Sequence, residues 1–293
     1  MGLRPPARAL LGAGARHRAV HLAPGRPDRR QPGRDLRDGG GSVTSVSPVA
    51  RERRHTLFFL EAVRSFAPVH LDAEVDMSRV LAERNRARAD GRRQSIVSHV
   101  VVAAGRVLAK HPEANAAIQG RLRARVARYP FVHAKVTVDG VLNGARVVLA
   151  TVVPNVHEAD VDQVQAHLSR IRAVDPERAP EFAGIRRVHA SALPLAYARF
   201  RRAVRDLRVR PLLTGTVAVT SLGHRDVDGF HSVGGTTVTI GVGRVADRPV
   251  VRDGQITVAP VLRLSLTFDH RVIDGAEAAD VLTDLKQELE NPA

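Results

Sequence analysis

The hydrophobic positions of this chain follow two different spacings, which alternate along the sequence from about residue 51 onward. Some segments repeat apolar residues every three or four positions, as amphipathic helices do, whereas others alternate apolar and polar residues, as half-buried strands do. The helical spacing predicts helices over residues 54–66, 78–89, 96–109, 163–174 and 195–207, with a further helix after Asp274. The alternating spacing predicts strands over residues 69–75, 134–138, 145–153, 214–222, 236–242 and 255–268. This alternation of elements indicates an α/β (α+β) fold in which helices cover a mixed β-sheet.

The first 47 residues show neither spacing. They are rich in Arg, Pro and Gly and end near the run Asp38-Gly-Gly-Gly-Ser. Such a segment buries too little apolar surface to offset the entropy lost on ordering. We therefore expect residues 1–47 to be a disordered tail and residues 48–293 to form one folded domain.

Composition narrows the possible chemistry. The chain has no cysteine, which excludes disulfides, thiolate nucleophiles and cysteine-based zinc sites, and we expect no metal site. No apolar run approaches the ~18 residues that a membrane span needs. The first thirty residues also lack the pattern of a signal peptide, since Arg26, Arg29 and Arg30 follow a weak apolar patch. The sequence thus predicts a cytoplasmic protein without a membrane segment.

The net charge of +15 comes almost entirely from arginine, because the chain has only three lysines. A basic surface attracts nucleic acid, or anionic ligands such as a nucleotide-bearing cofactor. Aromatic residues make up only 3% of the chain and do not alternate with the arginines, so stacking on bases is not indicated. No helix-turn-helix or zinc-finger spacing is present either. We therefore predict no specific nucleic-acid partner and interpret the charge as an arginine-biased composition.

The stretch from Leu264 to Ala276 holds the strongest candidate for catalysis. An alternating strand ends there at a polar corner that contains His270, and a helix follows Asp274. A histidine at such a corner can act as a general base near neutral pH. We expect Asp274 to fix the loop by pairing with an arginine. A purely structural interpretation makes Asp274 and Glu277 a capping box, and both interpretations are compatible.

The motif Asp269-His-Arg-Val-Ile-Asp274-Gly-Ala276 resembles the end of the catalytic domain of the dihydrolipoyl acyltransferases. These are the core subunits of the 2-oxo acid dehydrogenase complexes. Their fold and His-x-x-x-Asp-Gly signature are shared with chloramphenicol acetyltransferase. Further similar segments lie at Pro68-Val-His70, Gly215 to Gly223 and Ile240 to Gly243, so the resemblance covers most of residues 50–293.

The resemblance implies a role for three residues. His270 matches the base that deprotonates the attacking thiol, and Asp274 matches the acid that organises the site. Thr220 matches the hydroxyl that stabilises the oxyanion, although Thr220 and Ser221 can also be read as ordinary strand and turn residues. The resemblance further implies a homotrimer or a trimer-based assembly, with His270 of one chain facing Thr220 of its neighbour.

These observations lead to one expected function and two alternatives. We expect an acyltransferase that moves an acyl group between coenzyme A and a thiol, with dihydrolipoamide on a separate protein as the acceptor. The lipoyl group would come in trans, because the sequence contains neither a lipoyl domain nor a subunit-binding domain. The alternatives are a non-catalytic scaffold or interaction protein that retains the fold, and an acyltransferase with a small-molecule acceptor. The sequence assigns no particular arginine to coenzyme A.

Two further histidines are interpreted as non-catalytic. His224 begins a second His-x-x-x-Asp-Gly match that ends at Gly229, but no helical pattern follows it, so we expect His224 to lie in a loop. His70 is interpreted as a packing residue or as one near the substrate channel, with packing preferred.

Overall fold

The computed structural model describes residues 36–37, 43–120 and 122–292, and the chain divides into two units, Met1–Pro48 and Val49–Ala293. In the first unit, β1 (Leu36–Arg37) pairs antiparallel with β2 (Val43–Thr44). Most of the tail predicted to be disordered lies outside the described residues. The second unit contains all of the candidate site residues.

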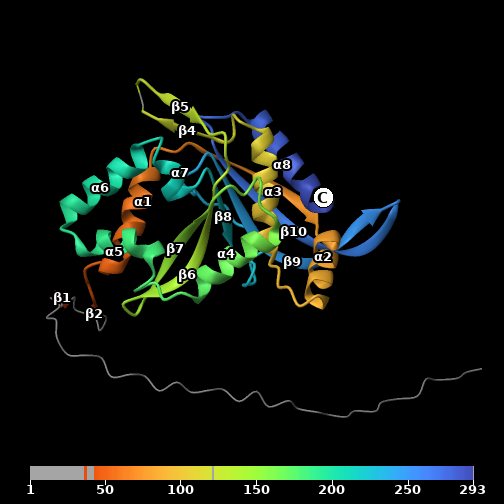
Figure 1. Ribbon diagram of the computed structural model, residues 1–293, viewed down its shortest axis with the longest axis horizontal. Coiled ribbons are helices and arrows are strands. Elements are labelled where there is room, and N and C mark those ends of the chain that lie inside the picture. The colour runs from red at the N-terminus through yellow and green to blue at the C-terminus, as the bar shows by residue number, and fades with distance from the viewer. Residues whose placement is uncertain (1–35, 38–42, 121, 293) are drawn as a thin grey trace, which may run out of the picture. The chain divides into compact units, whose positions relative to one another are not determined.

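A six-stranded mixed sheet forms the centre of the second unit (Figure 1). Its order is β3 (Pro68–Asp76), β10 (Gln255–Asp269), β9 (Val238–Arg252), β8 (Val217–Ser221), β6 (Ala134–Leu142) and β7 (Ala145–Val153). Within this sheet β8 is parallel to both of its neighbours, and the other neighbouring strands pair antiparallel. A separate hairpin joins β4 (Ala116–Gln119) to β5 (Arg125–Arg128).

The helices of this unit are α1 (Arg54–Val63), α2 (Ser78–Ala89), α3 (Ile96–Lys110), α4 (Val161–Ala173), α5 (Ala183–Ala190), α6 (Leu193–Arg205), α7 (Arg210–Thr214) and α8 (Gly275–Glu290), with 3-10 turns at Arg51–Arg53 and Pro180–Phe182. Ser95 caps α3, and its hydroxyl oxygen accepts a hydrogen bond from the backbone N–H of Ser98 at 3.2 Å. In the described part of the chain, no helix has the length and apolar character needed to cross a membrane.

One face of the sheet is apolar and packs on α3 and α8. The register places Leu266 beside Ile240, and Ile240 beside Val219, so the side chains of one row share this face. These residues are buried in one cluster with apolar side chains of both helices. Each fully buried Leu, Ile or Val contributes about 1.5–3 kcal/mol. This packing fixes the positions of the strands that carry the candidate site residues.

The opposite face of the sheet is polar and is covered by the loop of residues 222–237. A Cβ at Gly241 would lie 2.2 Å from the carbonyl oxygen of Phe230, and one at Gly234 would lie 2.4 Å from the Cβ of Ala218. Only glycine permits this close approach. The loop can therefore bury the polar side chains of Ser265 and Thr267.

The predicted α/β class is confirmed, and most elements lie within a few residues of their predicted bounds. The exception is β9, which continues to Arg252, ten residues beyond the predicted end at residue 242. Beyond the last pair of β3 with β10 (Asp76 with Val261), β9 and β10 continue as a two-stranded ribbon. Its exposed apolar residues, Val251, Ile256 and Val258, obscure the alternation that a half-buried strand shows. The prediction also missed β4, α5 and α7.

Candidate active site

His270 lies directly after β10, where the backbone is held from two sides. Its N–H donates to the carbonyl oxygen of Ala67 at 2.9 Å, and the N–H of Asp269 donates to that of Thr237 at 3.0 Å. The imidazole itself is 44% exposed and lies beside the ring of Phe268, with the ring centroids 5.4 Å apart. The structure thus presents an accessible histidine on a fixed backbone, as predicted for this corner.

Of the two carboxylates near His270, Asp269 is buried and Asp274 is exposed. The side chain of Asp269 is 1% exposed and accepts two hydrogen bonds from Arg271, from Nε at 2.9 Å and from Nη2 at 2.6 Å. The backbone N–H of Ala67 donates to the same carboxylate at 3.3 Å. A two-pronged guanidinium–carboxylate pair is among the stronger polar interactions, and here it also ties the corner to the segment after α1. The sequence predicted an arginine partner for Asp274, but at this corner Arg271 pairs with Asp269.

Asp274 occupies the N-cap position of α8, yet its side chain makes no capping hydrogen bond. Its Oδ1 lies 3.4 Å from Nδ1 of His270. Glu277, the second member of the expected capping box, instead places Oε1 3.0 Å from Nδ1 of His111. The capping-box interpretation is therefore wrong. The carboxylate of Asp274 remains available to the histidine.

His111 lies between two carboxylates at the start of α8. Its Nε2 is 3.0 Å from Oδ2 of Asp284, opposite the contact with Glu277. Burial lowers the pKa of His111, but the hydrogen bonds that its ring donates to Asp284 and Glu277 act in the other direction and prevail, so the pKa is raised. This pair of contacts fixes α8 against the end of α3.

Thr220 lies far from His270 within the chain. It pairs with Gly241 on β9, which in turn pairs with Ser265 on β10. His270 comes five residues after Ser265, which is about 17 Å along the strand, and β8 and β10 are two strand spacings apart, adding about 10 Å. The structure therefore does not bring Thr220 and His270 together in one chain.

A polar cluster that the sequence did not predict lies in the same row as Thr220. Oγ of Ser265 donates to Asp72 at 2.7 Å, and Nε2 of His231 lies 3.2 Å from the same carboxylate. The ring of His70 lies 4.7 Å from that of His231, and its Nδ1 is 3.0 Å from the hydroxyl of Thr267. His70 is exposed, so it is not the packing residue that was preferred. The polar positions on β3 and β10 were the one sign in the sequence from which this cluster could have been predicted.

A buried lysine on β6 is a further charged group of this domain. Lys135 is buried, donates to the carbonyl oxygen of Gly234 and lies 4.5 Å from the ring centroid of Phe59. Burial lowers its pKa to about 8, and the nearby Arg210 adds to this.

His224 lies in the turn after β8, which confirms the loop prediction. Within the described ranges, no three His, Asp or Glu side chains are grouped so that they could hold a metal ion.

Comparison with known proteins finds a family likeness in the C-terminal third of the chain. Residues 186–293, which include Thr220, His270 and Asp274, match the family model described as 2-oxoacid dehydrogenases acyltransferase (catalytic domain). The likeness to this family therefore covers the segment that carries all three candidate site residues. A relative from Bacillus subtilis (strain 168), the dihydrolipoyllysine-residue acetyltransferase component of the pyruvate dehydrogenase complex, is 55% identical over 53 residues. That match covers 18% of this chain and 12% of the relative, so the chain spans only a small part of the relative's length.

Solved acyltransferase structures extend the likeness of fold beyond the family segment. The cubic core of the pyruvate dehydrogenase multienzyme complex superposes with a TM-score of 0.64 at 20% identity, covering 86% of this chain and 93% of that chain. A dihydrolipoamide acetyltransferase from Azotobacter vinelandii superposes with a TM-score of 0.63 at 21% identity, covering 84% and 91% of the two chains. The predicted acyltransferase fold is confirmed.

Proposed function

We propose that this chain is an acyltransferase that moves an acyl group between coenzyme A and a thiol, with dihydrolipoamide on a separate protein as the acceptor. The observation that carries the proposal is the corner at His270. An accessible imidazole stands there on a fixed backbone, with a carboxylate oxygen 3.4 Å from one ring nitrogen. Because Nδ1 faces Asp274, Nε2 is the nitrogen left to exchange a proton with a thiol. In the Azotobacter vinelandii enzyme, the histidine and asparagine whose catalytic role was investigated have the same four-residue separation.

The proposed reaction needs one base and one oxyanion donor. His270 removes the proton from the attacking thiol, and the thiolate then adds to the thioester carbonyl. The negative charge that forms on the carbonyl oxygen is stabilised by the hydroxyl of Thr220. Removal of such a donor typically lowers the rate by ~10²–10³. When the intermediate collapses, His270 returns the proton to the departing thiolate. Asp274 holds the ring and favours the imidazolium that forms.

A second copy of the chain would complete this site, because Thr220 lies about 17 Å along the sheet from His270. The ribbon of β9 and β10 supports such an assembly. Val251, Ile256 and Val258 are 72%, 80% and 73% exposed, and a cluster of exposed apolar residues marks an interaction surface. We propose the homotrimer that the family resemblance implies, acting in the cytoplasm, with residues 48–293 as the catalytic domain and the lipoyl group supplied in trans.

The test is release of thiol from acetyl-coenzyme A by the purified protein, with and without dihydrolipoamide. We expect turnover with the dithiol, loss of turnover in His270→Ala and nearly normal turnover in His224→Ala, which changes the second His-x-x-x-Asp-Gly motif. Turnover with another small-molecule acceptor, but not with dihydrolipoamide, would assign that molecule as the acceptor. If the wild type hydrolyses or transfers nothing from any acyl-coenzyme A tested, the protein is an interaction protein and the proposal fails.

A further inference from the structure

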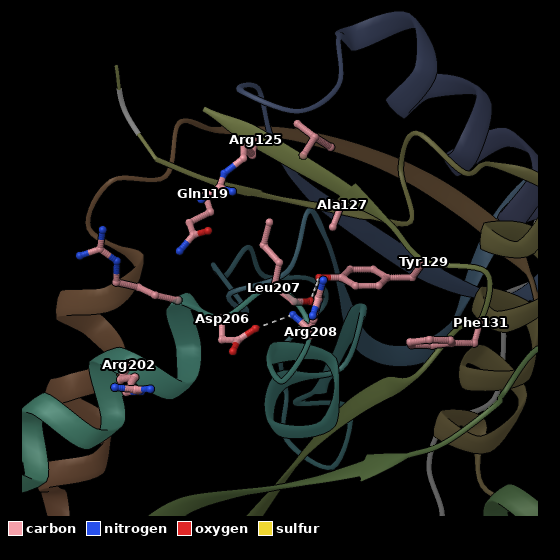
Figure 2. A pocket seen from close by; sticks show the side chains of 11 residues that line it. Gln119, Arg125, Ala127, Tyr129, Phe131, Arg202, Asp206, Leu207 and Arg208 are labelled. Carbon is pink, nitrogen blue, oxygen red and sulfur yellow. Dashed lines mark hydrogen bonds between the residues drawn. The ribbon is translucent and has the colours of Figure 1, made fainter. Parts of the chain in front are cut away.

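A hollow of about 930 Å³ lies between the β4–β5 hairpin and the end of α6. Figure 2 shows Arg125 and Gln119 from the hairpin beside it, and Arg202 on the helix. We call this hollow the arginine cleft and define it by Gln119, Arg125, Tyr129, Arg202, Arg205 and Arg208. Its volume falls within the range of sites that bind small molecules.

The charge of the arginine cleft is strongly one-sided. Four guanidinium groups line it, and Asp206 is the one carboxylate in its lining. Oδ1 of Asp206 accepts a hydrogen bond from the backbone N–H of Arg208 at 2.9 Å, so this oxygen serves the turn after α6. Several like charges around one hollow repel each other, and a concave surface concentrates their field. An anion bound there would relieve the repulsion.

A local explanation accounts for only part of the cluster. Arg202 and Arg205 lie in the last turn of α6, where a positive side chain is favoured by the helix dipole. Arg125 comes from β5, and Arg208 comes from the turn that follows α6, so neither gains from that dipole. Three separate segments of the chain therefore contribute arginines to the lining of one hollow.

One wall of the arginine cleft is fixed. The hydroxyl of Tyr129 donates to the carbonyl oxygen of Leu207 at 2.8 Å, which anchors the turn that carries Arg208. Burial raises the pKa of Tyr129, so it stays a donor at neutral pH. Tyr129 also contacts Phe131, whose ring stacks on His133 with the centroids 4.3 Å apart. A fixed wall lowers the entropy that a ligand must overcome on binding.

We propose that the arginine cleft binds a ligand that carries two or more phosphate groups. Planar guanidinium groups match phosphate oxygens in two-pronged contacts, and four of them exceed what a single carboxylate can use. A hollow of this depth favours a small ligand over a flat protein surface. The diphosphate could come from the nucleotide end of coenzyme A or from a free nucleotide. The inference rests on the cleft and does not require the acyl transfer proposed above.

Arg210 contacts the hairpin that forms one side of the arginine cleft. This residue begins α7, and its guanidinium donates to the carbonyl oxygens of Ile118 and Gly235 at 3.2 and 2.7 Å. Burial lowers its pKa, while the charges of Tyr129 and Asp269 oppose that effect.

Calorimetric titration of the full chain tests the proposal with coenzyme A, ADP, pyrophosphate and a poly-glutamate peptide. We expect the phosphate ligands to bind the wild type and the double variant Arg205→Gln/Arg208→Gln to bind them at least about tenfold more weakly. The matched control, Arg199→Gln/Arg201→Gln, removes the same charge from α6 at exposed residues outside the cleft lining and should leave binding unchanged. Circular dichroism would show that all variants are folded.

The ligands separate the two sources of phosphate. Equal arginine-dependent binding of pyrophosphate and coenzyme A supports a general diphosphate site, and much tighter binding of coenzyme A supports that ligand as the occupant. Absence of any diphosphate binding, an equal loss in the control, or arginine-dependent binding of poly-glutamate alone would overturn the proposal. Binding of ADP and pyrophosphate is measured without any acyl transfer, so a failure of acyl transfer and a failure of the cleft are distinguishable.

Discussion

The guanidinium of Arg271 holds the buried carboxylate of Asp269 with two hydrogen bonds, at 2.6 and 2.9 Å, directly beside the exposed His270. Since Asp269 is 1% exposed, the guanidinium of Arg271 offsets the cost of burying its carboxylate. The ion pair also contacts the segment after α1, where Nη1 of Arg271 donates to Oγ of Ser65 at 3.2 Å. The position of the candidate base thus depends on an ion pair between the residues on either side of it.

Removing Arg271 should be costly for stability. In Arg271→Met the buried carboxylate of Asp269 loses its hydrogen-bonded counter-charge, and we expect a loss of about 3 kcal/mol or more in the free energy of unfolding by urea. Arg146→Met breaks an exposed pair with Asp139 and should cost less than about 1 kcal/mol. Equal losses in the two variants would show that the Asp269–Arg271 pair does not support the fold.

A site shared between chains predicts complementation between inactive variants. His270→Ala and Thr220→Ala chains should each be strongly impaired alone, whereas co-expressed mixtures should regain activity, because some interfaces then combine an intact His270 with an intact Thr220. Ser221→Ala serves as the neighbouring control and should change activity little. Mixed oligomers that stay as inactive as their components would place both residues in one chain's site, or outside any site.

Lys135 should make stability depend on pH in the alkaline range. Its pKa is lowered to about 8 in the folded chain, whereas an unfolded chain has the ordinary value of about 10.4. The unfolded state therefore binds more protons between these values, and stability rises with pH across that window. From pH 7 to pH 10 the wild type should gain about 2 kcal/mol relative to Lys135→Met.

The control for this measurement is Lys110→Met, at an exposed lysine on the last turn of α3. Its unfolding free energy should keep a constant offset from the wild type over the same pH range. A constant offset for Lys135→Met as well would mean that the lysine stays charged inside the fold.

His111 should make stability depend on pH in the opposite sense to Lys135, so that its contribution falls as pH rises. Its folded pKa is raised, with burial opposing and the contacts to Asp284 and Glu277 prevailing, so its contribution to stability is complete below the unfolded value of about 6.5. That contribution is lost as pH rises through the folded pKa. The stability difference between wild type and His111→Gln should therefore shrink from pH 6 to pH 9. His224→Gln, at an exposed turn, should show no such trend.

Elements that depend on local spacing are predictable from the amino-acid sequence alone. The apolar period of α3 and its Ser95 cap, the alternation of β3 and the corner at His270 are all readable along the chain, because their causes lie within a few residues. The same locality explains one error. Asp274 and Glu277 have the spacing of a capping box. Glu277 instead contacts His111, which is 166 residues away in the sequence.

Relationships between distant segments emerge only when the chain is packed. The pairing of Thr220 with Gly241 and of Gly241 with Ser265 sets the separation between Thr220 and His270, and no spacing along the chain contains that register. The arginine cleft likewise gathers side chains from β5, α6 and the turn beyond it. Burial of Asp269 and Lys135 follows from the elements that cover them. Contacts of this kind depend on which surfaces exclude water together, and only the packed sheet and its covering loop determine that.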